Sequence, residues 1–260
     1  MKRPFEVWNA DNMPVQAPFF KSPSIPYFCK DLSSINIYCR TSPEIIKKYL
    51  EPTPFEYVSN NFIVNFGDYA NGTSATYHDL GIIVPVKYKD LIGGYYLFEY
   101  EDLASSVSAG RELWGYPKKT ADFKKEEKDG KTSVSVFRED AEIVHFEVDL
   151  NKKPRQELPV VPQYPHILLY TMPRHDGPGI LTQKVLSRDS SPDFVTKKKV
   201  EGYADIKLSG YENFPIIEPL DELNPVEVYG ASYTIGDYAA THENGWAKVV
   251  DVIIPDKDLK

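Results

Sequence analysis

The chain has 260 residues, 42% hydrophobic and 26% charged, which is typical of a globular protein with a sizeable core. Its formal net charge of −8 argues against nucleic-acid and anionic membrane partners, because both require clustered lysine and arginine. The sequence has no apolar run of the roughly 20 residues that span a bilayer, no visible signal segment and only two cysteines, so we expect a cytoplasmic protein with reduced thiols.

The first predicted elements are an arm, a strand and a helix. Five prolines within residues 1–27 predict an extended N-terminal arm that lies on the body of the protein. Apolar and polar residues alternate over 34–40, which predicts a half-buried strand. A short helix should begin at Pro43, with Ser42 as its N-cap, and stop before Pro52.

The middle of the chain predicts two strands, a short helix and a sharp turn. The strand-like segments lie within 81–102 and are rich in β-branched and aromatic residues. The following segment, 104–113, has the spacing of a short helix, and Gly115 is placed to end it. Lys118 and Lys119 then begin the next extended segment, where successive side chains point to opposite faces of a strand.

The C-terminal half reads as further strands and turns. Asp-Gly at 129–130 supplies the positive φ values of a hairpin turn, and the lysines of 197–199 suit a solvated strand end. The apolar run 247–255 predicts a buried strand, and 236–248 predicts an extended hairpin loop. We therefore expect one domain over 1–260 of the α+β class, mainly β, with a closed or nearly closed sheet and a few short helices.

Lys118 and Lys119 allow two interpretations. Most adjacent lysines are surface residues, because an ammonium group prefers water. A lysine that points inward would instead be desolvated, which lowers its pKa and favours the neutral, nucleophilic amine. A neighbouring cation would act in the same direction.

The surroundings of the lysine pair carry a family resemblance. The chain has Gly-Arg-Glu-Leu at 110–113, two intervening residues, and Tyr-Pro-Lys-Lys at 116–119. This pattern resembles the hallmark of the acetoacetate decarboxylase family at eight positions with the same spacing. Weaker similarity extends over most of the chain, including the arm and the strands before the motif. The resemblance implies a β-rich cone or barrel with flanking short helices, assembled into a homo-oligomer.

The resemblance also implies catalytic roles for four residues. Lys118 matches the lysine that forms the Schiff base, and Lys119 matches its neighbour; the family is itself a known example of a lysine activated by desolvation or a nearby cation. Arg111 and Glu112 match an ion pair of the hallmark. Their role is either chemical or a structural bracing of the turn.

Several positions bear on substrate binding, and some of them depart from the family pattern. Tyr116 lies within the motif, and Asp79 stands where the family has a glutamate, so its contact with a substrate would be longer or bridged by water. The family has a second glutamate where this chain reads Phe-Ile-Val at 62–64. It also has an arginine where this chain has Leu32, with Lys30 as the nearest replacement cation.

Glu99 is a further departure, because it stands where the family is apolar. On an alternating strand, Leu97, Glu99 and Glu101 share one face, and Phe98 and Tyr100 share the other. If the Glu99 face is the inner one, the carboxylate lies beside Lys118 as a substrate-binding or acid–base group. Exposed glutamates are more common than buried ones, so the pattern favours the outer face.

The implied activity is that of a lyase that needs no metal and no organic cofactor, and the histidines indeed lack metal-ligand spacing. Lys118 would form an imine with a small keto acid, most simply acetoacetate or a related β-keto acid that loses CO2. An aldolase, dehydratase or hydratase could use the same imine without losing CO2, and a non-catalytic ligand-binding member is a third reading. The sequence leaves open the keto acid, the choice of reaction, the number of subunits and the role of the 236–248 loop.

Overall fold

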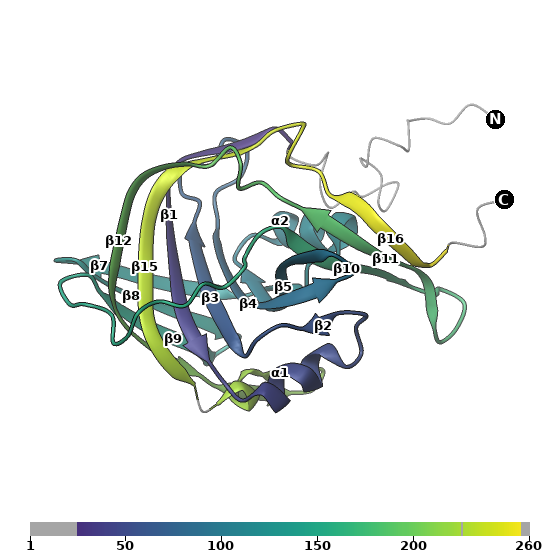
Figure 1. Ribbon diagram of the computed structural model, residues 1–260, viewed down its shortest axis with the longest axis horizontal. Helices are drawn as coiled ribbons and strands as arrows, with labels where there is room; N and C mark the ends of the chain where they lie inside the picture. Colours follow the sequence, from purple (N-terminus) through teal and green to yellow (C-terminus); the bar gives the residue numbers. More distant parts are fainter. Residues whose placement is uncertain (1–24, 225, 256–260) are drawn as a thin grey trace.

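The structure, a computed structural model, describes residues 25–224 and 226–255, so the predicted arm over 1–27 lies almost wholly outside the described residues. Strands predominate in this part of the chain and the helices are short (Figure 1), as the sequence predicted. The strands are β1 (Tyr27–Arg40), β2 (Glu56–Tyr57), β3 (Asn61–Asp68), β4 (His78–Tyr88), β5 (Leu91–Glu101), β6 (Lys118–Thr120), β7 (Asp122–Lys128), β8 (Lys131–Arg138), β9 (Ala141–Asp149), β10 (His166–Pro173), β11 (Ile180–Arg188), β12 (Val195–Leu208), β13 (Gly210–Asn213), β14 (Ile216–Pro219), β15 (Glu227–Ala240) and β16 (Lys248–Ile254). The helical segments are α1 (Pro43–Leu50), α2 (Ala104–Ala109), the π turn η1 (Gly110–Trp114) and the 3-10 turn η2 (Leu220–Leu223).

One strongly curved sheet organises the fold. Its strands follow the order β16-β11-β10-β5-β4-β3-β1-β15-β12-β9-β8-β7, while β2 pairs with β4 and β6 pairs with β5. The sheet curls into a cone (Figure 1), but within the described residues β7 and β16 end it without pairing with each other. The expected cone is therefore confirmed as an open one. Among the described helices, none is long and apolar enough to cross a membrane.

The helix α1 and the hairpin turn between β7 and β8 form where the local sequence predicted them. The helix α1 begins at Pro43, follows Ser42 in an extended conformation, and buries Ile46 and Leu50 against the core. In the turn between β7 and β8, Asp129 has a φ of 52° and Gly130 a φ of 76°, as a type I′ turn requires.

The predictions for the C-terminal strand and loop were wrong in part. The segment after Ala240 is not a hairpin loop, because β15 pairs with β1 and β12 whereas β16 pairs with β11. The strand β16 is not buried either: Val249 is 58% exposed and Val252 is 46% exposed. The apolar run is exposed because β16 lies at the edge of the sheet, which a composition pattern cannot reveal.

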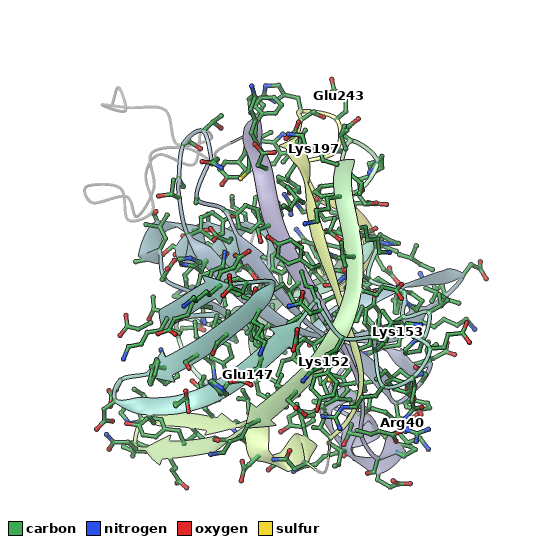
Figure 2. The ribbon with its side chains drawn as sticks, turned by 90° about the vertical axis from the view of Figure 1, so that its left-hand side faces the viewer. Arg40, Glu147, Lys152, Lys153, Lys197 and Glu243 are labelled. Atoms are coloured by element: carbon green, nitrogen blue, oxygen red, sulfur yellow. The ribbon has the colours of Figure 1, made fainter. Side chains whose placement is uncertain are left out.

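Many charged side chains lie on the periphery of the molecule, outside the buried site described below. Figure 2 shows Lys197 and Glu243 towards one end of the long strands and Arg40 towards the other. Lys197 bonds to Asp31 over 2.8 Å and also pairs with Asp237, so the lysine run on β12 is the solvated strand region that was expected.

The two faces of β5 separate the main core from the polar site. Phe98 and Tyr100 are buried in the largest apolar cluster, whereas Tyr96 belongs to a smaller cluster on the other face. The register with β4 shifts at Leu97, which is an extra residue opposite the Ile82–Ile83 step. This bulge turns Tyr96 towards the same side as Glu99, although an unbroken strand would place them on opposite faces.

Candidate active site

The turn before β6 brings the Lys118 side chain inward. Gly110 begins the π turn η1, and a Cβ atom at this position would lie 2.5 Å from Cδ and 2.6 Å from Cε of Lys118. Gly115 ends the turn with a φ of 77°, a left-handed conformation that glycine adopts without strain. The glycines of the motif therefore allow the chain to reverse tightly and let the lysine pass close to the backbone.

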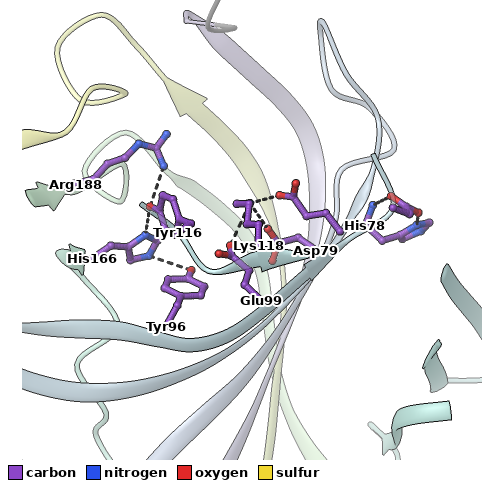
Figure 3. A network of polar contacts seen from close by, with 10 residues as sticks. His78, Asp79, Tyr96, Glu99, Tyr116, Lys118, His166 and Arg188 are labelled. Atoms are coloured by element: carbon purple, nitrogen blue, oxygen red, sulfur yellow. Dashed lines mark hydrogen bonds and ion pairs between the residues drawn. The ribbon is translucent and has the colours of Figure 1, made fainter. Parts of the chain in front are cut away.

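Three buried carboxylates surround the amine of Lys118. Its Nζ atom lies 3.1 Å from an oxygen of Asp79 and 3.1 Å from Oε1 of Glu99, and it also pairs with Glu101. Strand register explains this cluster. Glu99 on β5 pairs with Lys118 on the parallel strand β6, and Glu101 on β5 pairs with Asp79 on the antiparallel strand β4. Figure 3 shows Lys118 beside Asp79 and Glu99.

Electrostatics in this cluster differ from the sequence expectation. Burial alone lowers the pKa of Lys118, but the charges of Glu101, Glu99 and Asp79 outweigh it and raise the pKa well above its ordinary value. For the acids, burial acts in the other direction, because it disfavours the charged carboxylate. It raises the pKa of Glu101 to about 8, against the opposing charge of Lys118, and raises the pKa of Glu99 well above its ordinary value. In the free protein the lysine is thus held as an ammonium ion, and burial favours protonated carboxyl groups around it.

Lys119 lies on the opposite face of the sheet from Lys118, as strand alternation predicts. Its Nζ donates a 2.7 Å hydrogen bond to Glu218, a residue of β14 that is 1% exposed. The same carboxylate accepts bonds from Tyr100 over 2.7 Å and from Arg138 over 2.9 Å. The sequence suggested that the two ammonium groups act on each other. Instead, the ion pair with Glu218 holds Lys119 away from the pocket.

The other predicted cations and Glu112 also lie outside the pocket. Arg111 is exposed and donates a 3.0 Å hydrogen bond to the carbonyl oxygen of Lys118, so it braces the turn. Glu112 is partly buried, and burial raises its pKa. Lys30 is exposed on β1 and does not line the cavity. The prediction that Lys30 replaces the family arginine in the pocket was wrong, because the side chain at this register position faces solvent.

Glu99 occupies the inner face, and the expectation that it is a surface charge was wrong. Its residue is 2% exposed, its Oε1 contacts Lys118, and its Oε2 is buried without a hydrogen-bond partner. Glu101 shares this face and is 0% exposed. The alternation that placed the two glutamates together was right, and only the direction of the face was misjudged.

A second polar group lies at the other end of the site. The imidazole of His166 is 2.7 Å from the hydroxyl of Tyr116 at Nδ1 and 3.4 Å from the hydroxyl of Tyr96 at Nε2. Arg188 donates to the Tyr116 oxygen over 3.4 Å (Figure 3). Burial, reinforced by the charges of Arg188 and Lys118, lowers the pKa of His166 well below its ordinary value, so this imidazole is neutral.

Both groups line one cavity of about 190 Å³. On this measure a water molecule needs about 10–15 Å³, so the space suits a small organic acid. The wall is unusually rich in tyrosine, contributed by Tyr27, Tyr69, Tyr77, Tyr96, Tyr116, Tyr164 and Tyr238. The oxygens of Asp79, Glu99 and Glu101 are close enough to hold a metal ion, but the ammonium group of Lys118 already lies against all three.

The curled sheet and the buried lysine among carboxylates define an enzyme with a lysine-centred site. A family model described as acetoacetate decarboxylase matches residues 12–249, so the chain belongs to the acetoacetate decarboxylase family, whose members are lyases. An acetoacetate decarboxylase from Burkholderia multivorans is 29% identical over 248 residues, covering 86% of this chain and 89% of the relative. One from Paraburkholderia phytofirmans is 36% identical over 122 residues, 44% of each chain.

Solved structures share the fold at lower identity. The acetoacetate decarboxylase of Legionella pneumophila has a TM-score of 0.77 and 20% identity, covering 98% of this chain and 100% of that chain. The enduracididine biosynthesis enzyme MppR, in complex with pyruvate, has a TM-score of 0.66 and 13% identity, covering 88% and 93%. These similarities support the cone fold that the motif had implied.

Sequence reasoning missed several residues of the site. Glu101 shared the predicted face with Glu99, and this alternation was a usable signal for it. His166 and Arg188 stand on β10 and β11, far from the motif in sequence, and no local pattern marks them as site residues. Only the parallel pairing of β10 with β5, at His166 and Gly94, brings this part of the chain to the lysine.

Proposed function

We propose that this lyase forms an imine between Lys118 and a small keto acid, and that its principal reaction is the decarboxylation of acetoacetate or a related β-keto acid. The observation that carries the proposal is the buried amine of Lys118, which faces a cavity of suitable size and contacts three carboxyl groups. Membership of the acetoacetate decarboxylase family supports the same chemistry.

The contacts suggest how the amine becomes a nucleophile. Lys118 first passes a proton to a neighbouring carboxylate, and Asp79 already accepts a 3.1 Å hydrogen bond from its amine. The free amine then attacks the ketone carbon, and loss of water gives a protonated imine. In this scheme the carboxylates activate the lysine by accepting its proton, and no help from Lys119 is needed.

The imine then serves as the electron sink. The bond to the substrate carboxyl carbon breaks, CO2 leaves, and the electron pair moves to the imine nitrogen to form an enamine. A carboxylic acid beside Lys118 protonates the enamine carbon, and Glu99 has the burial and raised pKa that keep a proton available. Water finally hydrolyses the imine, releases the ketone and restores the amine.

Glu99 also supports a second candidate, aldol or dehydration chemistry on the same imine. A buried acid beside the lysine can take a proton from the carbon next to the imine, or protonate a hydroxyl leaving group, without loss of CO2. The solved relative MppR is described with pyruvate and with a condensation product of pyruvate, and shares the fold of this chain.

Borohydride trapping tests the proposal. Reduction in the presence of acetoacetate or pyruvate should add the mass of the reduced compound, or of its decarboxylated product, to the peptide that contains Lys118. Release of CO2 and the mass of new products then distinguish decarboxylation from condensation or dehydration. If none of a panel of keto acids gave an adduct on Lys118, the imine mechanism would be abandoned in favour of a binding function.

A further inference from the structure

The cavity contains a second cation, Arg188, at the end away from the acidic cluster. Among the described residues that line the cavity, Lys118 and Arg188 carry the positive charges. Lys118 is surrounded by three carboxylates, whereas Arg188 forms no ion pair with any described residue. Arg188 is partly buried, and a guanidinium group shielded from water without a counter-ion is unfavourable unless a ligand supplies one.

The contacts of Arg188 hold its guanidinium group in place without neutralising it. Its Nε donates a 2.7 Å hydrogen bond to the carbonyl oxygen of Gly245, and its Nη1 reaches the Tyr116 oxygen at 3.4 Å. The guanidinium carbon lies 4.5 Å from the ring centre of Trp114, a stacking contact that fixes its plane. The side chain of Tyr238 is a further hydrogen-bond partner of Arg188, and because arginine has five N–H donors, these contacts still leave donors for a ligand.

Its neighbours are neutral, so the positive charge persists. Burial raises the pKa of Tyr116 to about 12, which keeps the phenol protonated at physiological pH. The neighbouring His166 is neutral for the reason given above, and an imidazole contributes no negative charge in any case. Asp189, the next residue in the chain, accepts bonds from the backbone and hydroxyl of Ser191 instead.

We propose that Arg188 binds the carboxylate of the keto acid and thereby fixes the direction of the substrate, with the ketone at Lys118. This proposal rests on the proposed function and names its substrate class, a keto monocarboxylate. A carboxylate placed at the other end would meet the acidic cluster of Asp79, Glu99 and Glu101, and the negative charge of Asp79 would repel it. The same repulsion disfavours keto dicarboxylates, whose second carboxylate would lie near these acids.

Arg188 supplies the positive charge that the sequence had suggested for Lys30 or Arg111. Lys30 is exposed and Arg111 braces the turn, so neither can balance a substrate carboxylate. Arg188 provides that charge from β11, and the loop after β15 positions it through Gly245. The 236–248 segment, whose role the sequence left open, thus contributes a backbone acceptor that orients the arginine.

The test compares substrates with and without a carboxylate. In Arg188→Met, the acetoacetate concentration that half-saturates borohydride trapping on Lys118 should rise about 10- to 100-fold, the usual effect of losing a charged hydrogen bond. Trapping of acetone, a ketone without a carboxylate, should stay within about twofold of the parent. Arg188→Lys should recover part of the affinity, and the exposed-site control Lys30→Met should resemble the parent.

A second measurement separates this proposal from the imine mechanism. The hydroxy acid 3-hydroxybutyrate has a carboxylate but no ketone, so it cannot form an imine. Calorimetry should show that it binds to the parent protein and loses affinity in Arg188→Met, whether or not Lys118 ever gives an adduct. Equal weakening of acetoacetate and acetone trapping would make Arg188 a structural residue and overturn the proposal. So would unchanged affinity for both carboxylates.

Discussion

Replacing Glu99 with glutamine tests whether this buried acid transfers a proton in the reaction. The residue is 2% exposed, and burial raises the pKa of its carboxyl group well above the ordinary value. Its neutral form is therefore the one that glutamine imitates in both shape and charge. The substitution Glu99→Gln should remove the transferable proton while keeping the size of the side chain and an oxygen that can contact Lys118.

The expected fall in turnover reflects the loss of one proton-transfer group. General acid–base catalysis by one side chain contributes about 10²- to 10⁴-fold, which corresponds to roughly 3–5 kcal/mol in activation free energy. Turnover in Glu99→Gln should fall by this factor. Borohydride trapping on Lys118 should stay within about twofold of the parent, because the Lys118 contact of 3.1 Å is preserved by the amide oxygen.

The assay follows product formation and trapping on the same preparations. Glu126→Gln is a matched control, because Glu126 is an exposed glutamate on the strand β7 and should behave like the parent. Turnover within about twofold of the parent, a barrier change of only roughly 0.4 kcal/mol, would refute the role of Glu99 as proton donor. If trapping fell as much as turnover, the ionised carboxylate would instead be needed to form the imine.

Three further predictions concern the neighbours of Lys118. Gly110→Ala should slow trapping at least about tenfold, because its Cβ would displace the lysine chain; Gly177→Ala, where an added Cβ meets nothing within 4 Å, should not. Lys119→Met should leave the pH–rate profile unmoved but lower the free energy of unfolding by about 1 kcal/mol in urea titrations, since its ion pair lies on the opposite face. Glu101→Gln should flatten the pH dependence of stability. Because burial raises the pKa of Glu101 from 4.5 to about 8, the folded state binds more protons than the unfolded state in that interval. The free energy of unfolding therefore declines there as the pH rises, by at most about 1.4 kcal/mol per pH unit.

Each of these predictions can fail in a recognisable way. Normal trapping in Gly110→Ala would mean that the lysine does not need its close approach to the backbone. An upward shift of the lower pH limb in Lys119→Met would restore the neighbouring ammonium as an activating group. An unchanged slope between pH 5 and 8 in Glu101→Gln would show that Glu101 is not the group that holds the extra proton.

The sequence alone determined the local elements and the central residue of the site. Proline at the start of α1 and Asp129-Gly130 in the hairpin act through their own backbone preferences, so their outcome needs no knowledge of distant residues. The motif around Lys118 works in the same way, since glycines at 110 and 115 make the tight turn. Strand alternation also gave the correct pairing of Glu99 with Glu101.

The tertiary structure decided which face is inside, which charges meet, and what completes the pocket. Alternation separates two faces but does not say which one packs against other elements, so Glu99 could be misjudged as a surface residue. The same limit made β16 look buried when it is an edge strand. Arg188 reaches the cavity only because β10 and β11 pair beside β5, and long-range strand pairing leaves no periodic signal in the sequence.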